Sequence, residues 1–421
     1  MKKAGKTNNP YQYSHFLIRL FLGALVVCGV PALLLSSWSF LLSSYASLEW
    51  TSVAIVALSF VMAMLNLRRL NGFPGQRSLL AGIPLLGGWF AFFVGLLLSL
   101  RLPYSVAYLV FGFIVAGIWL VVQAYYLRGT HQLVLAYIPV GRMGNVEDLK
   151  GAKWVRLEEP VLPEGIAAIV ADLHAPDLGK EWQKFLAQCT LQRRLVYNIR
   201  QVEEALSGRV KIHHMYENNL GSLLPSPMYM TIKHILECVL IIASLPLTLP
   251  IMLVTALLIK LEDGGSVFYN QERVGQGGEP FKMYKFRSMT QNKAVNQETT
   301  TSAGDARITK IGRFIRKVRI DELPQFFNVL KGEMALIGPR AEFKKFADEL
   351  EQQVPFYQYR HIVKPGITGW AQVMHGYATG ADETQIKIEH DFYYIKYFSF
   401  WLDVFIVFKT IRTMLTGFGA R

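Results

Sequence analysis

Four long apolar segments within the first 130 residues constrain the fold more than any other feature of this sequence. They cover Leu20–Leu42, Trp50–Leu67, Leu79–Leu100 and Tyr104–Tyr126. Each is close to the roughly 20 residues that a helix needs to cross a bilayer. A cleaved signal peptide does not explain the first segment, because its apolar core is too long and three similar segments follow it. Residues 1–127 are therefore expected to form a transmembrane four-helix region.

The charges around these segments predict their orientation. Lysine and arginine residues precede the first segment, separate the second from the third and follow the fourth. The other two connections carry only Glu49 and Arg101. Because basic loops stay in the cytoplasm, the N-terminus and the chain after Tyr126 are expected there. A formal net charge of +13 predicts an anionic partner: the lipid surface, a nucleotide or nucleic acid.

Residues 128–217 show a second pattern, in which short apolar runs alternate with polar runs of helical spacing. This alternation predicts a small α/β domain. Its expected strands are Gln132–Ile138, Ile166–Asp172, Arg194–Ile199 and Arg209–Ile212, and its expected helices are Gly179–Cys189 and Gln201–Leu206. Glycines follow the first strand, but the complete G-x-G-x-x-G pattern is absent, so a dinucleotide site and a plain turn both stay open.

The stretch Arg307–Arg340 carries the residues with the clearest chemistry. Its first part places apolar side chains on one helical face and cations, including Arg313 and Arg316, on the other. The adjacent carboxylates Asp321 and Glu322 follow directly. Carboxylates alone would repel a phosphate, so the cations would have to hold a polyanionic substrate. The alternative is a solvated helix with an ordinary charged end.

The run DELPQFFNVLKGEMALIGPR, Asp321–Arg340, resembles the signature of the bacterial sugar transferases, which are monotopic polyprenyl-phosphate phosphoglycosyl transferases. Three further blocks stand in the family's order, at Asn270–Met289, Lys364–Val373 and His390–Thr410. The similarity extends from about Met230 to about Thr413. Several separate blocks are far more specific than a lone glycine motif, and the four preceding apolar segments are typical of the long form of this family.

The resemblance implies the transfer of a sugar-1-phosphate from a UDP-sugar to polyprenyl (undecaprenyl) phosphate, with release of UMP. Asp321 is implied as the nucleophile that carries the phosphosugar, and Glu322 as its metal-linked partner. Two adjacent anions that face a diphosphate require a hard cation, so both carboxylates are expected to bind Mg²⁺. Such a reaction initiates exopolysaccharide, capsule or O-antigen assembly. The expected location is the bacterial inner (cytoplasmic) membrane, with the catalytic domain in the cytoplasm.

Substrate binding is expected to fall to basic side chains and one aromatic ring. These residues are Lys282, Lys285, Arg287, Arg313, Arg316, Arg340 and Trp370. For the lysines, the alternative is an ordinary surface position on an edge strand. Two departures from the family's pattern stand out. Ala341 replaces the second proline of G-P-R-P, and residues 374–377 replace an asparagine-glycine-arginine run, which affects sugar or nucleotide specificity more than the chemistry.

Residues 231–421 are expected to form the catalytic domain, after a linker at residues 218–230. A fifth apolar segment, Thr231–Leu261, opens this domain and is long enough to cross a bilayer, but Pro246 and Pro250 interrupt it. A crossing would carry the catalytic blocks out of the cytoplasm, where nucleotide sugars are. A re-entrant helix that bends at the prolines keeps them inside, as the family resemblance implies.

The expected fold class is thus a membrane protein of α and α/β parts. It combines a four-helix transmembrane bundle, a small degenerate Rossmann-like α/β domain and a catalytic domain that carries the re-entrant membrane helix. The stretch Tyr393–Leu415 is apolar and aromatic and is interrupted by single basic residues, which predicts amphipathic helices in the membrane interface. A buried core helix is the alternative there.

A non-catalytic membrane scaffold or regulator of glycan assembly is the main alternative function, and the intact Asp321 and Glu322 argue against it. A conventional metal-dependent glycosyltransferase needs a D-x-D pair and a P-loop kinase needs G-x-x-x-x-G-K-[ST], and neither occurs. Nucleic-acid binding would explain the net charge but not the apolar segments or the carboxylates. The expected partners are a UDP-sugar, polyprenyl phosphate and the lipid bilayer, and the formation of a homodimer stays open.

Overall fold

The structure is a computed structural model, and its contacts divide the chain into two compact units, residues 1–207 and 208–421. Each unit is described by itself. The described residues are 10–38, 50–70, 78–130, 133–143, 146–149, 151–163, 165–166, 168–192, 194–212, 224–290, 307–375 and 381–416.

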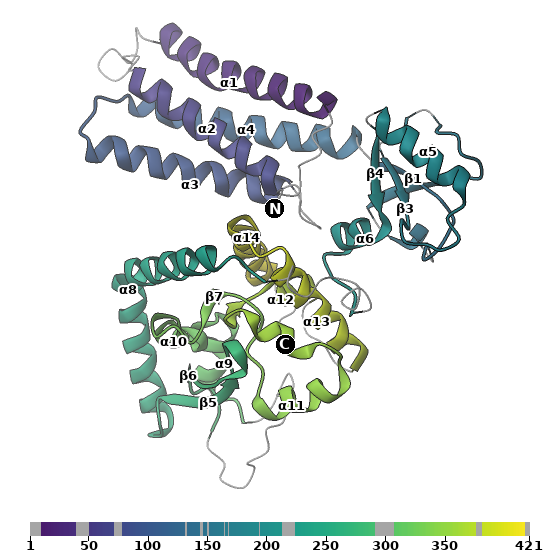
Figure 1. The fold of residues 1–421 in the computed structure, drawn as a ribbon. Helices are drawn as coiled ribbons and strands as arrows, with labels where there is room; N and C mark the ends of the chain where they lie inside the picture. Colours follow the sequence, from purple (N-terminus) through teal and green to yellow (C-terminus); the bar gives the residue numbers. More distant parts are fainter. Residues whose placement is uncertain are drawn as a thin grey trace. The chain divides into compact units, whose positions relative to one another are not determined.

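The first unit opens with four apolar helices that pack against one another (Figure 1). They are α1 (Pro10–Trp38), α2 (Trp50–Leu70), α3 (Ser78–Ser99) and α4 (Val106–Thr130). Tyr108 on α4 is fully buried and donates a hydrogen bond to the carbonyl of Cys28 on α1, at 2.8 Å. Large apolar side chains also cover the outer surface, as expected of helices that face lipid. The predicted apolar helices are confirmed.

A small parallel sheet follows, with the strand order β2-β1-β3-β4. Its strands are β1 (Leu133–Tyr137), β2 (Ala152–Arg156), β3 (Ala168–Ala171) and β4 (Leu195–Asn198), and its helices are η1 (Val146–Asp148), α5 (Lys180–Leu191) and α6 (Ile199–Ser207). Successive residues of a strand point to opposite faces. Ile169 packs with Phe185 of α5 and Val170 packs with Val202 of α6, so helices cover both faces of the sheet.

One strand of this region was not predicted, and one predicted strand is wrong. The edge strand β2 was not expected, because Ala152–Arg156 mixes polar and apolar residues without a clear period of two. Arg209–Ile212, predicted as a strand, is not one. The N–H of Val210 instead donates to the carbonyl of Glu389 at 3.0 Å, which attaches this segment to the second unit.

The second unit consists of a long helix, α8, and a compact set of short elements (Figure 1). After α8 (Pro227–Asp263) come β5 (Phe268–Val274), η3 (Gln276–Gly278), β6 (Pro280–Phe286), α9 (Lys310–Lys317), η4 (Ile320–Glu322), α10 (Gln325–Leu330), β7 (Ala335–Ile337), α11 (Lys344–Gln353), η5 (Tyr357–Ile362), β8 (Gly366–Thr368), α12 (Trp370–Met374), α13 (Ala381–Lys396) and α14 (Phe400–Thr416). The β5–β6 pair is antiparallel and the β7–β8 pair is parallel.

Helix α8 is bent, and Figure 1 shows it as two segments that meet at a sharp angle. Its 37 residues would span about 55 Å if they were straight. Yet Ile241 in its first half packs with Val329 of α10, and Ile259 in its second half packs with Ile315 of α9. Pro246 lies between these contacts and lacks the N–H that an unbroken helix would use. Both halves of α8 therefore pack against the same compact body.

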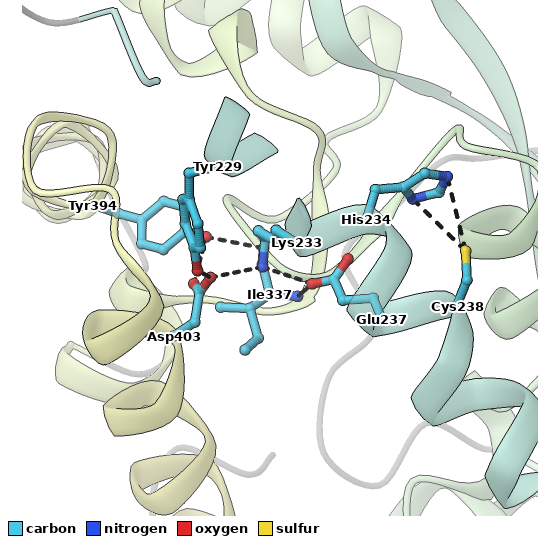
Figure 2. Close-up of polar contacts among 8 residues, drawn as sticks. All are labelled: Tyr229, Lys233, His234, Glu237, Cys238, Ile337, Tyr394 and Asp403. Carbon is cyan, nitrogen blue, oxygen red and sulfur yellow. Dashed lines mark hydrogen bonds and ion pairs between the residues drawn. The ribbon is translucent and has the colours of Figure 1, made fainter. Parts of the chain in front are cut away.

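A buried polar network joins the first half of α8 to helices α13 and α14 (Figure 2). The Lys233 ammonium lies 2.6 Å from Glu237 Oε1 and 2.9 Å from Asp403 Oδ2. Asp403 of α14 also accepts hydrogen bonds from the hydroxyls of Tyr229, at 2.6 Å, and Tyr394, at 2.7 Å. A buried charge is tolerated only when it is paired, so this network fixes how α8, α13 and α14 pack.

The same network reaches strand β7 through Ile337 (Figure 2). The N–H of Ile337 donates to Glu237 Oε1 at 3.4 Å, and its carbonyl accepts from the Tyr394 hydroxyl at 3.1 Å. Side chains of α8 and α13 therefore hold both polar backbone groups of the last residue of β7. The chain continues from this point directly into Gly338-Pro339-Arg340.

Candidate active site

The carboxylates Asp321 and Glu322 lie in the short 3₁₀ turn η4, directly after the basic helix α9. Two caps fix the start of α9. The Thr309 hydroxyl accepts from the N–H of Gly312 at 2.8 Å, and Glu262, near the end of α8, accepts from the N–H of Lys310 at 2.9 Å. The turn between α9 and η4 is made by Arg319 in the left-handed region, with φ of 60°.

Both carboxylates are buried, with only 9% of each residue exposed. Glu322 Oε1 lies 3.3 Å from the Lys285 ammonium and 3.5 Å from Arg319 Nη1. Asp321 Oδ1 is also buried, but it has no hydrogen-bond partner among the residues that the structure describes. A buried oxygen without a partner is costly, so Asp321 is the group here that is free to meet a ligand.

Burial and neighbouring charges shift the pKa values of the two carboxyl groups in opposite directions. Burial, together with the adjacent Glu322, raises the pKa of Asp321 to about 6, although nearby cations oppose this rise. Burial alone would also raise the pKa of Glu322, but the cations lower it instead. The largest of these lowering effects comes from Lys285, followed by Arg340 and Arg319. Glu322 is therefore the permanent anion of the pair, and Asp321 is the one that titrates near neutral pH.

A small pocket is lined by Glu322 and by two cations, whereas Asp321 is not among its lining residues. Its lining residues are Met283, Lys285, Glu322, Gln325, Met334, Arg340, Ala341, Gly366 and Ile367. The guanidinium of Arg340 has no hydrogen-bond or ion-pair partner within the described parts of the chain. An unpaired guanidinium at a pocket is suited to bind a phosphate by two parallel hydrogen bonds.

The position of Arg340 depends on close backbone packing between two loops. The N–H of Gly366 donates to the carbonyl of Pro339 at 2.8 Å, and the N–H of Gly338 donates to the carbonyl of Thr368 at 2.9 Å. A Cβ added at Gly366 would collide with the backbone of Gly338. Only glycine allows this approach, which explains why a G-P-R run and a K-P-G run occur together in the sequence.

The seven residues expected to bind substrate do not all converge. Lys285 and Arg340 line the pocket, and Arg316 lies near enough to lower the pKa of Asp321. Arg313 is exposed on α9. Lys282 is exposed on the opposite face of β6 from Lys285, because residues three apart in a strand point to opposite sides.

Arg287 and Trp370 are buried away from solvent. A Cβ added at Gly265 would collide with the Arg287 guanidinium, so this side chain packs over the turn that follows α8. Trp370 is 0% exposed, stacks on Tyr393 at 5.4 Å between ring centroids, and donates to the carbonyl of Gly208 at 2.6 Å. Both positions favour a packing role over the substrate contact that sequence reasoning assigned to them.

Three arginines near the site were missed. Arg319 pairs with Glu322, and its place directly before the Ile-Asp-Glu run could have drawn attention to it. Arg273 lies within the Asn270–Met289 block and donates to the carbonyl of Ala341 at 3.1 Å. Arg360 donates to the carbonyl of Arg340 at 2.9 Å. Its local sequence, Tyr-Arg-His, carries no signal of this contact.

The chemistry of Asp321 and Glu322 fits Mg²⁺ only if further oxygen ligands come from outside the protein. Among the described residues, no three His, Cys, Asp or Glu side chains gather into a site built from the protein alone. Mg²⁺ commonly takes one or two carboxylates together with substrate phosphates and water. The unpartnered Asp321 Oδ1 and the adjacent Glu322 supply that donor set.

Helices apolar and long enough to cross a membrane, a buried carboxylate pair and a pocket with two cations are typical of a membrane protein that binds an anionic ligand. The family described as "Bacterial sugar transferase" matches residues 228–417, which span α8 to the end of α14. A UDP-N-acetylgalactosamine-undecaprenyl-phosphate N-acetylgalactosaminephosphotransferase of Aeromonas hydrophila is 47% identical over 402 residues, covering 95% of each chain. The chain therefore belongs to the bacterial sugar transferase family.

Other relatives match a shorter part of the chain. A UDP-glucose:undecaprenyl-phosphate glucose-1-phosphate transferase of Escherichia coli K12 is 40% identical over 176 residues, covering 41% of this chain and 38% of that protein. A putative undecaprenyl-phosphate N-acetylgalactosaminyl 1-phosphate transferase of Bacillus subtilis is 44% identical over 132 residues, covering 31% of this chain and 74% of that protein.

The raised pKa of Asp321 predicts the acid limb of the pH profile. If ionised Asp321 is the reacting group, kcat/KM should fall as the pH drops through about 6, because the carboxyl becomes protonated there. Replacing Arg316 with Gln removes a cation that lowers this pKa, so the limb should move to higher pH. Lys317→Gln, a charge removed from an exposed position on the same helix, should leave the midpoint in place. A limb near pH 4 in the wild type would contradict this assignment.

Proposed function

We propose that this protein transfers a sugar-1-phosphate from a UDP-sugar to polyprenyl (undecaprenyl) phosphate and releases UMP. The observation that carries the proposal is the unpartnered, buried Asp321 Oδ1, next in the chain to Glu322, which lines a pocket together with Lys285 and Arg340. The named activities of the relatives support the same reaction. The transferred sugar begins a membrane-bound glycan such as an exopolysaccharide, a capsule or an O-antigen.

The reaction proceeds by two displacements at one phosphorus atom. Asp321 Oδ1 attacks the β-phosphorus of the UDP-sugar, the bond to the oxygen that bridges the two phosphates breaks, and UMP leaves. A phosphate oxygen of the polyprenyl phosphate then attacks the aspartyl-bound phosphorus. This step breaks the acyl phosphate bond, frees the carboxylate and yields a polyprenyl diphosphate sugar.

The cations of the pocket suit this chemistry. Lys285 and Arg340 line the space beside the carboxylates, where the diphosphate would lie. Positive groups already in place stabilise the charge that builds up on the phosphoryl oxygens and the leaving group without reorganising. Lys285 also balances Glu322, at 3.3 Å, so a second anion can remain ionised next to the nucleophile.

Glu322 and Asp321 would hold Mg²⁺ in this reaction. When bound, the ion offsets the repulsion between two carboxylates and a diphosphate and polarises the phosphoryl group. Glu322, whose pKa is lowered by its cationic neighbours, stays negative at neutral pH and would supply one carboxylate to the ion.

The function is tested most simply by the nucleotide that purified protein releases. Because the relative that matches along 95% of the chain is named for UDP-N-acetylgalactosamine, that donor should be tried first, with UDP-glucose as comparison. UMP release that depends on undecaprenyl phosphate supports the proposal. Free UDP would indicate a conventional glycosyltransferase, and no release with either donor or other UDP-sugars would favour a membrane scaffold.

Replacing Asp321 with Asn should abolish turnover while it preserves expression and membrane insertion. The amide has nearly the same size but lacks the nucleophilic charge, so the rate should fall by at least roughly 1,000-fold. Asp348→Asn, an exposed position on α11, is the matched control and should retain activity. Appreciable UMP release by the Asp321→Asn protein would rule out covalent catalysis at this position.

Chelation should stop the reaction if Asp321 and Glu322 share a divalent cation with the diphosphate. Excess EDTA should reduce UMP release to background, and an excess of Mg²⁺ should restore it. Thermal unfolding should change little with EDTA, because the described residues offer no cluster of protein ligands whose folding would depend on a metal. Full activity in chelator would exclude the metal role.

We propose that α8 is a re-entrant membrane helix and that the second unit lies in the cytoplasm, against the inner membrane. The bent course of α8 and the large apolar side chains exposed along its middle support this placement, among them Leu240, Leu247 and Leu253. Helix α14 also exposes Phe400, Val407, Ile411 and Met414, as a helix in the interface would.

A cysteine-labelling experiment tests this topology. Cysteines placed singly at Ser226 and Ser266, on either side of α8, should both be shielded from an impermeant thiol reagent outside intact cells. The background lacks Cys28, Cys189 and Cys238. Replacing Pro246 and Pro250 with Ala should favour a straight, crossing helix and reduce activity. Labelling of Ser266→Cys from outside, with Ser226→Cys protected, would mean that α8 crosses the membrane.

For the parallel sheet we propose a degenerate Rossmann-like module with a role in assembly, including formation of a homodimer. Both carboxylate oxygens of the buried Asp172 accept hydrogen bonds at 3.1 Å, from the N–H groups of Arg142 and His174. In a dinucleotide-binding domain the N–H groups of the loop after the first strand bind the pyrophosphate. Here the side chain of Asp172 already satisfies the N–H of Arg142, which argues against a nucleotide at this position.

A further inference from the structure

The backbone that carries Arg340 is held by buried arginine side chains, and this suggests a role for them in the reaction. Arg360 is 3% exposed, and its guanidinium donates at 2.9 Å both to the carbonyl of Arg340 and to Asp391. A third bond reaches the hydroxyl of Tyr357 at 2.8 Å. Arg360 is thus fixed from two sides while it holds the main chain of the residue that lines the pocket.

A second arginine holds the next carbonyl along the chain. Arg273, in β5, donates to the carbonyl of Ala341 at 3.1 Å and to Gln271 Oε1 at 2.9 Å. Its guanidinium lies 3.4 Å from the centroid of the Phe343 ring, a short cation–π contact. Two successive carbonyls, those of Arg340 and Ala341, therefore each accept a charge-assisted hydrogen bond from a buried side chain.

Burying an arginine costs free energy unless its guanidinium is hydrogen-bonded or paired, and here part of that bonding goes to main-chain carbonyls. Three N–H groups of Arg360 are used on fixed partners, and lysine could not reproduce this planar geometry. At position 341 the chain carries alanine, whose backbone is less restricted than that of proline. The two carbonyl contacts remove that freedom at the point where the Arg340 side chain leaves the backbone. The guanidinium of Arg340 is itself unpaired within the described residues, so its place depends on its backbone.

We propose that Arg273 and Arg360 are positioning residues that hold Arg340 in place for the donor diphosphate. This inference rests on the proposed function, in which Arg340 binds that diphosphate. Neither arginine touches substrate, and each acts through the main chain of residues 340 and 341. Asp391 belongs to the same arrangement because it fixes the Arg360 guanidinium and balances its charge.

A double-mutant cycle separates positioning from a general contribution to stability. Arg360→Lys and Arg273→Lys keep the buried positive charge but lose the carbonyl contact, and each is made alone and together with Arg340→Gln. With Arg340 present, each lysine variant should lower kcat/KM for the donor by roughly 10- to 100-fold. With Arg340→Gln, the same change should cost less than about 2-fold, because the group it positions is gone. Loss of thermal stability should be equal in both backgrounds.

Matched variants make each outcome decisive. Arg156→Lys, an exposed position in β2, should change neither quantity. An equal loss of kcat/KM with and without Arg340, or no loss at all, would overturn the positioning role. If Arg360→Lys fails to fold, Arg273→Lys decides the question alone. If Arg340→Gln leaves kcat/KM unchanged, it is the proposed binding role of Arg340 that fails, which is a different result.

Discussion

The burial of two adjacent carboxylates is the interaction on which the second unit of this protein depends. Asp321 and Glu322 repel each other, and burial makes that repulsion expensive unless cations compensate it. Glu322 receives that compensation from Lys285 and Arg319, at 3.3 and 3.5 Å. Asp321 Oδ1 has no partner among the described residues. The pocket therefore forms where β6 and the loop after β7 place positively charged side chains, Lys285 and Arg340, near η4.

The long apolar helix α8 supports the backbone that leads into this site. Glu237 on α8 accepts from the N–H of Ile337, and Tyr394 donates to the carbonyl of the same residue. Arg360 and Arg273 then hold the carbonyls of Arg340 and Ala341. The backbone from the end of β7 to Ala341, which carries Arg340, is thus held by side chains of α8, α13, η5 and β5. A change in how α8 packs would therefore affect the backbone that leads to the pocket.

Much of this arrangement could be predicted from local signals. Apolar runs of membrane length revealed the first four helices, and the Asp-Glu pair after a basic helix indicated the site. Strand β2 was missed because Ala152–Arg156, at the sheet edge, has no clean alternation. The separation of Lys282 from Lys285 follows from strand periodicity and could have been foreseen. The role of Arg360 could not, because it depends on a contact with Arg340, twenty residues away in the sequence.

Mass spectrometry of the protein incubated with donor alone tests the central claim, that Asp321 carries the phosphosugar. Without polyprenyl phosphate the second displacement cannot occur, so the intermediate should accumulate as one equivalent of UMP is released. The account predicts that the intact protein gains the mass of one sugar phosphate and that the added mass maps to the peptide containing Asp321. UMP release without any added mass, or an adduct on a different residue, would contradict it.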